Sequence, residues 1–267
     1  MNDMTAGARL LKPGYIETAN EVSLFEAAWR QQLPVLIKGP TGVGKTRFVE
    51  HMAERLQRPL VTVACHEDLT AADLVGRYLL QGNDTVWVEG PLTRAVKQGA
   101  ICYLDEVVEA RSDTIVVLHP LMDHRRELHI ERLGATLKAD DGFMLVMTYN
   151  PGYQTLAKDL KASTRQRMVA IEFGFPSAAV EHEILCTVHG IPASISQALV
   201  ALAQAARRTQ HAGLAETVST RALISAGRLA QAGVPLREAV IATTAQAVSD
   251  DPQVVAGLSE LVAAYIG

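Results

Sequence analysis

Residues 34–56 join a short apolar run, a glycine-rich loop and a helical pattern, and this segment constrains the fold more than any other. The loop has the spacing G-x-x-x-x-G-K-[ST], whose glycines let backbone N–H groups converge on phosphate oxygens. The start of the following helix adds positive potential. The sequence therefore predicts an α/β fold in which the loop binds the phosphates of a nucleotide. The predicted phosphate-binding residues are Gly39, Pro40, Thr41, Gly42, Val43, Gly44, Lys45 and Thr46.

Five short apolar runs alternate with helical patterns through the first two-thirds of the chain. Near-continuous apolar runs are typical of strands that are covered on both faces. Their alternation with helices predicts a parallel five-stranded sheet flanked by helices. The predicted strands are Pro34–Lys38, Leu60–Ala64, Ala100–Leu104, Phe143–Thr148 and Val169–Phe173.

The composition changes after Phe175-Pro176, where strand-like runs give way to alanine-rich amphipathic segments. We therefore expect an α/β core over residues 1–175 and a small all-helical lid over residues 176–267. The predicted lid helices are Ala178–His189, Ser194–Thr209, Ser219–Ala232, Leu236–Val248 and Pro252–Ile266.

Two segments, near 76–88 and 125–147, read as hairpins inserted into the core. The first has a turn cluster at Gln81–Asp84. In the second, residues 126–137 form the expected first arm and residues 139–142 the expected turn. The hairpins are either ordinary surface features or elements that reach a partner or a central pore.

Composition and charge argue against several functional classes. Of the 267 residues, 48% are hydrophobic and 20% are charged, as in ordinary globular proteins. The net charge of -4 argues against nucleic acid as the main partner, since phosphate backbones attract basic surfaces. No run of 18 apolar residues predicts a membrane span, and three isolated cysteines fit reduced thiols, so we expect a cytoplasmic protein.

Two adjacent acids follow the third predicted strand. At the carboxyl edge of the sheet, Asp105 is expected to hold Mg²⁺ together with Thr46, and Glu106 to act as the general base that polarises the attacking water. Lys45 would reach the β- and γ-phosphates.

Asn150 and three arginines are weaker candidates from the residues alone. Asn150 follows the fourth predicted strand, where it could orient water or simply occupy a turn before proline. Arg165 and Arg167 precede the last predicted strand. They either stabilise charge in the transition state of hydrolysis or form a solvated pair on the surface. Arg221 opens a lid helix, where a cation is unfavourable to the helix dipole unless an anionic partner is present.

The ordered motifs resemble those of MoxR-type AAA+ ATPases, and more narrowly the CbbQ/NirQ/NorQ group, with CbbQ as the most similar pattern. The resemblance covers nearly the whole chain. It is carried by the glycine-rich loop, Thr62–Thr70, Asp73–Leu79, Glu89–Arg94, Ala100–Arg111, Tyr149–Tyr153 and Lys158–Lys161.

The resemblance implies a homo-hexameric ring that binds ATP and Mg²⁺ at subunit interfaces. On the matching positions, Asn150 becomes the sensor 1 residue and Arg221 the sensor 2 residue on the lid. Arg167, and with it Arg165, would serve as arginine fingers for the neighbouring subunit. The two hairpins correspond to the helix-2 insert and the pre-sensor-1 hairpin of such proteins.

The resemblance also implies ATP hydrolysis coupled to remodelling of a target enzyme, together with a von Willebrand A domain partner of the CbbO kind. Rubisco, released from inhibitory sugar phosphates, is the first expected target, and maturation of nitric oxide reductase is the alternative. A nucleotide-gated binding adaptor with little hydrolysis is the alternative from another class. A small-molecule kinase fits poorly, because it does not need a separate lid and two protruding hairpins.

Overall fold

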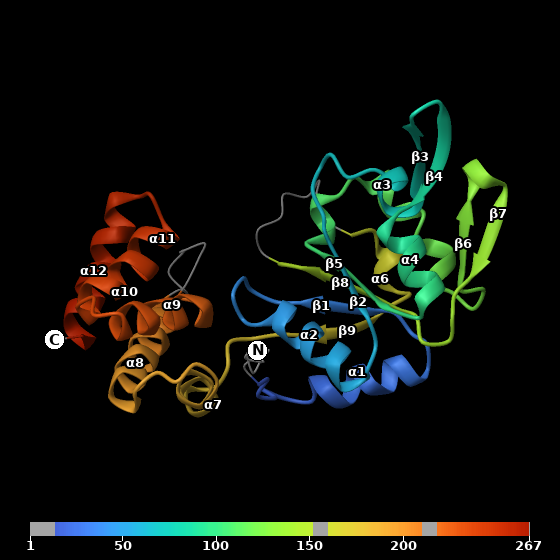
Figure 1. The fold of residues 1–267 in the computed structure, drawn as a ribbon. Coiled ribbons are helices and arrows are strands. Elements are labelled where there is room, and N and C mark those ends of the chain that lie inside the picture. Colours follow the sequence, from blue (N-terminus) through green and yellow to red (C-terminus); the bar gives the residue numbers. More distant parts are fainter. Residues whose placement is uncertain (1–13, 152–159, 210–217, 267) are drawn as a thin grey trace, which may run out of the picture.

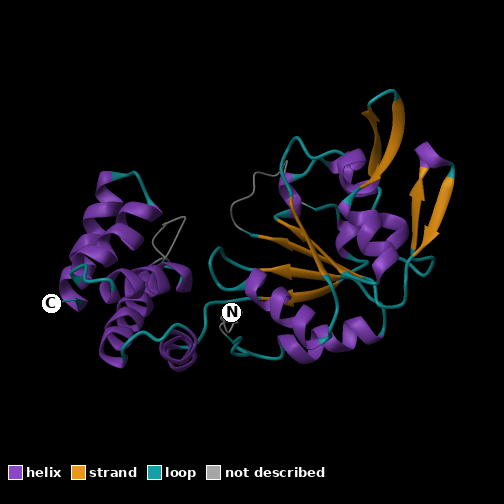
Figure 2. Cartoon of the chain, viewed as in Figure 1, coloured by secondary structure: helices purple, strands orange, loops and turns teal. Residues whose placement is uncertain are grey.

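An α/β core and a helical lid make up the structure, a computed structural model that describes residues 14–151, 160–209 and 218–266. Figure 1 shows the core and the lid as two bodies joined by the chain segment between the last strand of the core and the first helix of the lid. Figure 2 shows that the strands are confined to the core, whereas the lid is built from helices.

The core sheet has five strands in the order β2-β5-β8-β1-β9, and every neighbouring pair in it is parallel. The strands are β1 (Val35–Lys38), β2 (Leu60–Ala64), β5 (Ile101–Asp105), β8 (Met144–Tyr149) and β9 (Val169–Glu172). Each of them agrees with a predicted strand to within one residue at either end, so the predicted fold class is confirmed.

The two faces of the sheet pack against different helices, because successive side chains of a strand point to opposite faces. On β5, Ile101 and Tyr103 join a cluster with Phe25 and Phe48 from helices α1 and α2. Cys102 joins the other cluster, to which helices α3 and α4 contribute. The core helices are α1 (Glu21–Arg30), α2 (Lys45–Arg55), α3 (Ala71–Val75), α4 (Pro91–Gln98), α5 (Ser112–Val116) and α6 (Ala162–Arg165).

The lid has its own apolar cluster, which draws on residues from Leu185 to Ile266. Side-chain caps mark three of its helix starts: Ser177 before α7, Ser219 before α9 and Asp251 before α12 each accept a backbone N–H. The lid helices are α7 (Ala178–Glu183), continued by the π-helical turn Ile184–Val188, α8 (Ala193–Thr209), α9 (Thr220–Gln231), α10 (Leu236–Val240), continued by the π-helical turn Ile241–Ala245, α11 (Gln246–Val248) and α12 (Pro252–Tyr265).

Both expected hairpins are present, and they lie on the side of the core away from the lid (Figure 1). The first pairs β3 (Gly76–Gln81) with β4 (Asp84–Glu89) around the expected turn. The second differs from the prediction: β6 (Glu127–Ile130) pairs with β7 (Ala135–Lys138), so both arms, apart from Lys138, lie inside the segment expected to be one arm.

The true turn of the second hairpin is at residues 131–134, where Gly134 has φ 58° and closes the turn in the left-handed region. Residues 139–142 instead lead into β8, and the Asp140 side chain accepts the backbone N–H of Gly142. Gly134 is the sequence feature that could have located this turn.

Within the described residues, none of the helices combines the length and the hydrophobicity that a membrane crossing requires.

Candidate nucleotide-binding site

Three neighbouring strands bring the predicted site residues to one edge of the sheet. The glycine-rich loop follows β1, Asp105 ends β5 and Asn150 follows β8, and β8 lies between β1 and β5. Because parallel strands end at the same edge, Asn150 is placed between the loop and the two acids. The order of the strands therefore explains why residues from distant segments meet.

Lys45 is almost fully buried at the start of α2. Its ammonium group donates to the carbonyl oxygens of Gly39 at 2.6 Å and Pro40 at 2.9 Å, and to the side-chain oxygen of Asn150. Burial lowers the pKa of Lys45 to about 8, although the nearby Asp105 and Glu106 oppose this shift. An anionic ligand would therefore gain a partly desolvated cation at this position.

The carboxylate of Asp105 is held by two buried hydroxyl groups. Tyr103 donates to Asp105 Oδ1 at 2.7 Å and Thr148 donates to the same oxygen at 2.6 Å. The Tyr103 hydroxyl also lies 3.1 Å from Thr46 Oγ1, so one phenol links both predicted metal ligands. Burial, with a smaller contribution from the bond to Asp105, raises the pKa of Tyr103, which keeps the phenol protonated as a donor.

Glu106 adopts a left-handed backbone conformation with φ 54°, which is uncommon for a residue with a side chain. Its backbone N–H donates to Thr148 Oγ1 at 3.1 Å. Asn150 donates through Nδ2 to Thr41 Oγ1 at 3.2 Å and to Glu106 Oε1 at 3.4 Å. Backbone strain of this kind is concentrated at functional sites. Asn150 thus connects the glycine-rich loop, the ammonium of Lys45 and the second acid.

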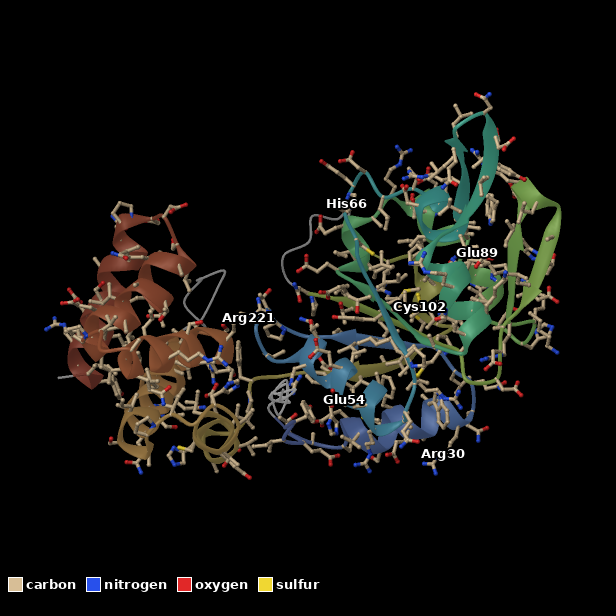
Figure 3. All side chains as sticks on the ribbon, in the orientation of Figure 1. Arg30, Glu54, His66, Glu89, Cys102 and Arg221 are labelled. Carbon is tan, nitrogen blue, oxygen red and sulfur yellow. The ribbon has the colours of Figure 1, made fainter. Side chains whose placement is uncertain are left out.

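A cavity of about 580 Å³ opens onto these groups, and its lining includes residues of both the core and the lid. Its volume is within the range of small-molecule sites. The lid contributes Thr220 and Arg221 from α9, and Figure 3 shows Arg221 on the part of the lid that faces the core. Further lining residues from the lid are Ile184, Val188, His189 and Ile224.

The glycine-rich loop and the start of α9 are in direct contact. The backbone N–H of Arg221 donates to the carbonyl oxygen of Gly42 at 3.2 Å. Gly42 has φ 76°, and a Cβ placed there would lie 2.6 Å from Ser219 Oγ and 2.7 Å from Ser219 Cβ. Glycine is therefore required at position 42 both by the backbone conformation and by the closeness of the lid.

The segment before α1 lines the same cavity through Tyr15, Ile16 and Thr18. The buried carboxylate of Glu21 holds this segment, because it accepts the Tyr15 hydroxyl at 2.6 Å and the backbone N–H of Thr18 at 2.6 Å. The ring of Tyr15 in turn stacks on His51 with 5.2 Å between centroids. These contacts give the cavity an apolar and aromatic part beside its charged part.

Arg165 and Arg167 are not among the residues that line this cavity. Both side chains are exposed, and Arg167 donates to the carbonyl oxygen of Ser163 at 2.9 Å. The structure thus brings together the glycine-rich loop, Asp105, Glu106, Asn150 and Arg221, and leaves the other two arginines outside the group. Parts of the motifs at 149–153 and 158–161 lie outside the described residues.

Several cavity and contact residues were not predicted from the sequence. Tyr103 precedes Asp105 by two positions and shares its face of the strand, and that spacing was a usable signal. Thr148 lies at the same kind of position before Asn150. By contrast, nothing in the local sequence indicates that residues before α1 or at the end of α7 line the cavity. The unpredicted residues are Gly14, Tyr15, Ile16, Thr18, Arg47, Glu50, Tyr103, Thr148, Ile184, Val188, His189, Thr220 and Ile224.

Comparison with known families and proteins agrees with this geometry. A profile of the AAA domain (dynein-related subfamily) matches residues 34–168, and a profile described as CbbQ/NirQ/NorQ C-terminal matches residues 181–265. The denitrification regulatory protein NirQ of Stutzerimonas stutzeri is 56% identical over 96% of this chain and 93% of its own length. Protein NorQ of Paracoccus denitrificans is 56% identical over 96% and 94%, and protein CbbQ of Hydrogenophilus thermoluteolus is 50% identical over 90% of each chain.

Solved structures share the fold at low sequence identity. A RuvB variant from Thermotoga maritima has a TM-score of 0.55 and 15% identity, covering 91% of this chain and 67% of its own. A structure from Cytophaga hutchinsonii has a TM-score of 0.53 and 17% identity, covering 91% and 80%. With the two matching profiles and relatives that are 50–56% identical over most of its length, the chain belongs to the CbbQ/NirQ/NorQ family of AAA+ ATPases.

Proposed function

We propose that this protein hydrolyses ATP in a magnesium-dependent reaction and uses that reaction to remodel a target enzyme. The observation that carries the proposal is the position of Asn150, whose side chain bonds to Lys45, Thr41 and Glu106 at once. A γ-phosphate and an attacking water would have to lie among these groups. The AAA+ family is one of ATPases, which supports the same reaction.

Each residue at the edge of the sheet has a role in this proposal. Lys45 binds the β- and γ-phosphates, and Asn150 orients the water and contacts the γ-phosphate. Glu106 polarises the water as general base. Arg221 adds positive charge from the lid. The adenosine would lie toward Tyr15 and the lid residues that line the apolar part of the cavity.

The oxygen groups of Thr46 and Asp105 fit a magnesium ion. Mg²⁺ prefers oxygen ligands and takes few of them from the protein, keeping waters and nucleotide phosphates for the rest. The shared contact with the Tyr103 hydroxyl brings the two ligands into one cluster. When bound, the metal would neutralise charge that develops on the phosphates.

A homo-hexameric ring completes the proposed site. AAA+ proteins assemble as oligomeric rings, and Arg165 and Arg167 lie outside the cavity of their own chain. In a ring, these arginines would reach the nucleotide of the neighbouring subunit. An arginine that contacts transition-state charge can raise kcat by about 10³–10⁵.

Of the two candidate targets we propose nitric oxide reductase first, because more of the similar relatives carry NirQ or NorQ names than the CbbQ name. NirQ and NorQ relatives are 55–56% identical to this chain, whereas the CbbQ relative is 50% identical. Both of these NirQ relatives are described as denitrification regulatory proteins. Sequence motifs alone placed Rubisco first, and Rubisco remains the second candidate because the CbbQ relative matches over 90% of this chain. In both cases we expect a von Willebrand A domain protein as the partner.

Steady-state phosphate release tests the ATPase. We expect Lys45→Ala to lose ATP binding and Glu106→Gln to bind ATP but hydrolyse it at least about 100-fold more slowly, as general-base loss implies. Glu238→Gln, an exposed lid substitution, is the matched control and should leave the rate unchanged. Hydrolysis by Glu106→Gln at the wild-type rate would reject Glu106 as the base. If the wild-type ring releases no phosphate with its partner present, the protein is a nucleotide-gated adaptor instead.

Two target assays separate the candidates. Nitric oxide reductase activity would be measured in cells in which wild-type protein is replaced by Glu106→Gln. Carboxylation by inhibited Rubisco would be measured after addition of the protein, a von Willebrand A domain partner and ATP. Loss of reductase activity with no effect on Rubisco supports the first target, and the reverse result supports the second.

A further inference from the structure

A buried ion pair lies inside the lid beside the site but outside the cavity. The carboxylate of Glu181, on α7, is fully buried. It accepts two hydrogen bonds from the guanidinium of Arg207, on α8, each at 2.8 Å, and a third from the Thr220 hydroxyl at 2.6 Å. One carboxylate therefore joins α7, α8 and the first residue of α9.

Arg207 extends these contacts beyond Glu181. Its Nε donates to the carbonyl oxygen of Val218 at 3.0 Å, just before α9. Its guanidinium lies over the ring of Phe175 at 4.1 Å from the centroid, a cation–π contact. Phe175 belongs to the segment between β9 and α7 and packs against the apolar cluster of the core. Arg207 thus contacts both the segment that leads into α9 and the connection between the two bodies.

The residues that this pair holds, Val218 and Thr220, are chain neighbours of Ser219 and Arg221, which touch the glycine-rich loop. Thr220, which bonds to Glu181, directly precedes Arg221, and both line the nucleotide cavity. Ser219, directly before Thr220, caps α9 and lies against Gly42. Any shift of Thr220 would therefore move the backbone N–H of Arg221 away from Gly42 and move the arginine side chain in the cavity.

Stability alone is a poor explanation for such a pair. Burying two charges is costly, and well-packed apolar residues of similar volume often stabilise a protein as much or more. An ion pair that accepts only one geometry does, however, fix the relative orientation of the elements it joins, since a bidentate arginine–carboxylate contact is directional.

We propose that Glu181 and Arg207 position Arg221 against the nucleotide phosphates and link that position to the core through Phe175. Neither residue of the pair lines the cavity, and the pair would act on the nucleotide through the Ser219–Arg221 segment. The inference rests on the proposed function, because it requires that Arg221 take part in ATP hydrolysis. It adds that the orientation of the lid at Phe175 controls the rate of that reaction.

A double-mutant cycle tests this inference in the assembled full-length protein. Glu181→Gln would be made in the wild type and in Arg221→Ala, and kcat and KM for ATP measured for all four proteins. We expect Glu181→Gln to lower kcat about 10–100-fold in the wild type, the effect of a displaced catalytic group. In Arg221→Ala the same change should alter kcat by less than about twofold, because residues that act as a unit are not additive.

Matched substitutions keep the test independent of folding. Glu183→Gln changes an exposed carboxylate two residues away and should leave kcat and KM unchanged. Thr220→Val removes only the hydroxyl that bonds to Glu181 and should lower kcat, whereas Thr220→Ser keeps a hydroxyl and should restore it. If Glu181→Gln does not assemble, the same comparison is made with Thr220→Val and Thr220→Ser, each in the wild type and in Arg221→Ala.

The possible failures can be told apart. If Arg221→Ala leaves kcat unchanged, Arg221 has no role in hydrolysis, and both the assigned role and this inference are wrong. If Arg221→Ala lowers kcat but Glu181→Gln and Thr220→Val lower it equally in both backgrounds, only the positioning inference is overturned.

Discussion

Replacing Tyr103 with phenylalanine removes one hydroxyl group from the centre of the predicted metal site. The ring lies in the apolar cluster under α1 and α2, so phenylalanine preserves its packing. What is lost is the bond to Asp105 at 2.7 Å and the contact with Thr46 at 3.1 Å. Thr148 still donates to Asp105, so the carboxylate keeps one of its two hydroxyl partners.

The expected magnitude follows from these contacts. A hydrogen bond to a charged acceptor contributes about 1.5–3 kcal/mol. If that energy is lost from the orientation of Asp105 and Thr46, the affinity for Mg²⁺ falls about 10–100-fold, as is usual when a group that orients a metal ligand is removed. The affinity for nucleotide without metal should change little, because the glycine-rich loop and Lys45 are untouched.

The assay is a titration of Mg²⁺, or of Mn²⁺ followed by electron paramagnetic resonance, into the protein saturated with ADP. Tyr149→Phe is the matched control, because Tyr149 is a buried tyrosine of the neighbouring strand that packs in the cluster on the other face of the sheet. An unchanged metal affinity in folded Tyr103→Phe would refute the idea that this hydroxyl organises the metal ligands.

Three further expectations concern the loop, the pH dependence and the ring. Gly42→Ala should lower ATP affinity and increase hydrogen exchange at the start of α9, because the added Cβ collides with the lid. Gly44→Ala is the control, since a Cβ at position 44 meets no atom within 4 Å. It should strain the backbone of the loop without increasing hydrogen exchange in α9. Burial lowers the pKa of Lys45 to about 8, so its ammonium loses the proton above that pH in the nucleotide-free protein. The Kd for MgATP should therefore rise by up to about tenfold per pH unit above pH 8. A Kd that stays constant from pH 7 to pH 9.5 would contradict this. Mixing Arg167→Ala with Glu106→Gln subunits should restore part of the hydrolysis, and no recovery in mixed rings of confirmed assembly would exclude Arg167 as a finger acting in trans.

Local signals were enough to predict the strands that position the candidate site. The five strands were predicted from apolar runs, which are short-range features of the sequence. The predicted strand ends agree with the observed ends to within one residue. The hairpin near 125–147 shows where this fails. The sequence predicts the turn at residues 139–142, whereas the pairing of β6 with β7 places it at residues 131–134, closed by Gly134.

The sequence by itself determined the glycine-rich loop, the two acids after β5 and the amide after β8, because each is a motif attached to its own strand. Only the tertiary structure decided how the lid meets them. The contact of Ser219 with Gly42, and the Glu181–Arg207 pair behind it, join segments far apart in the chain. Such contacts depend on how separate elements pack in three dimensions. The periodicity of one segment shows which of its faces is apolar, but not which other segment packs against that face.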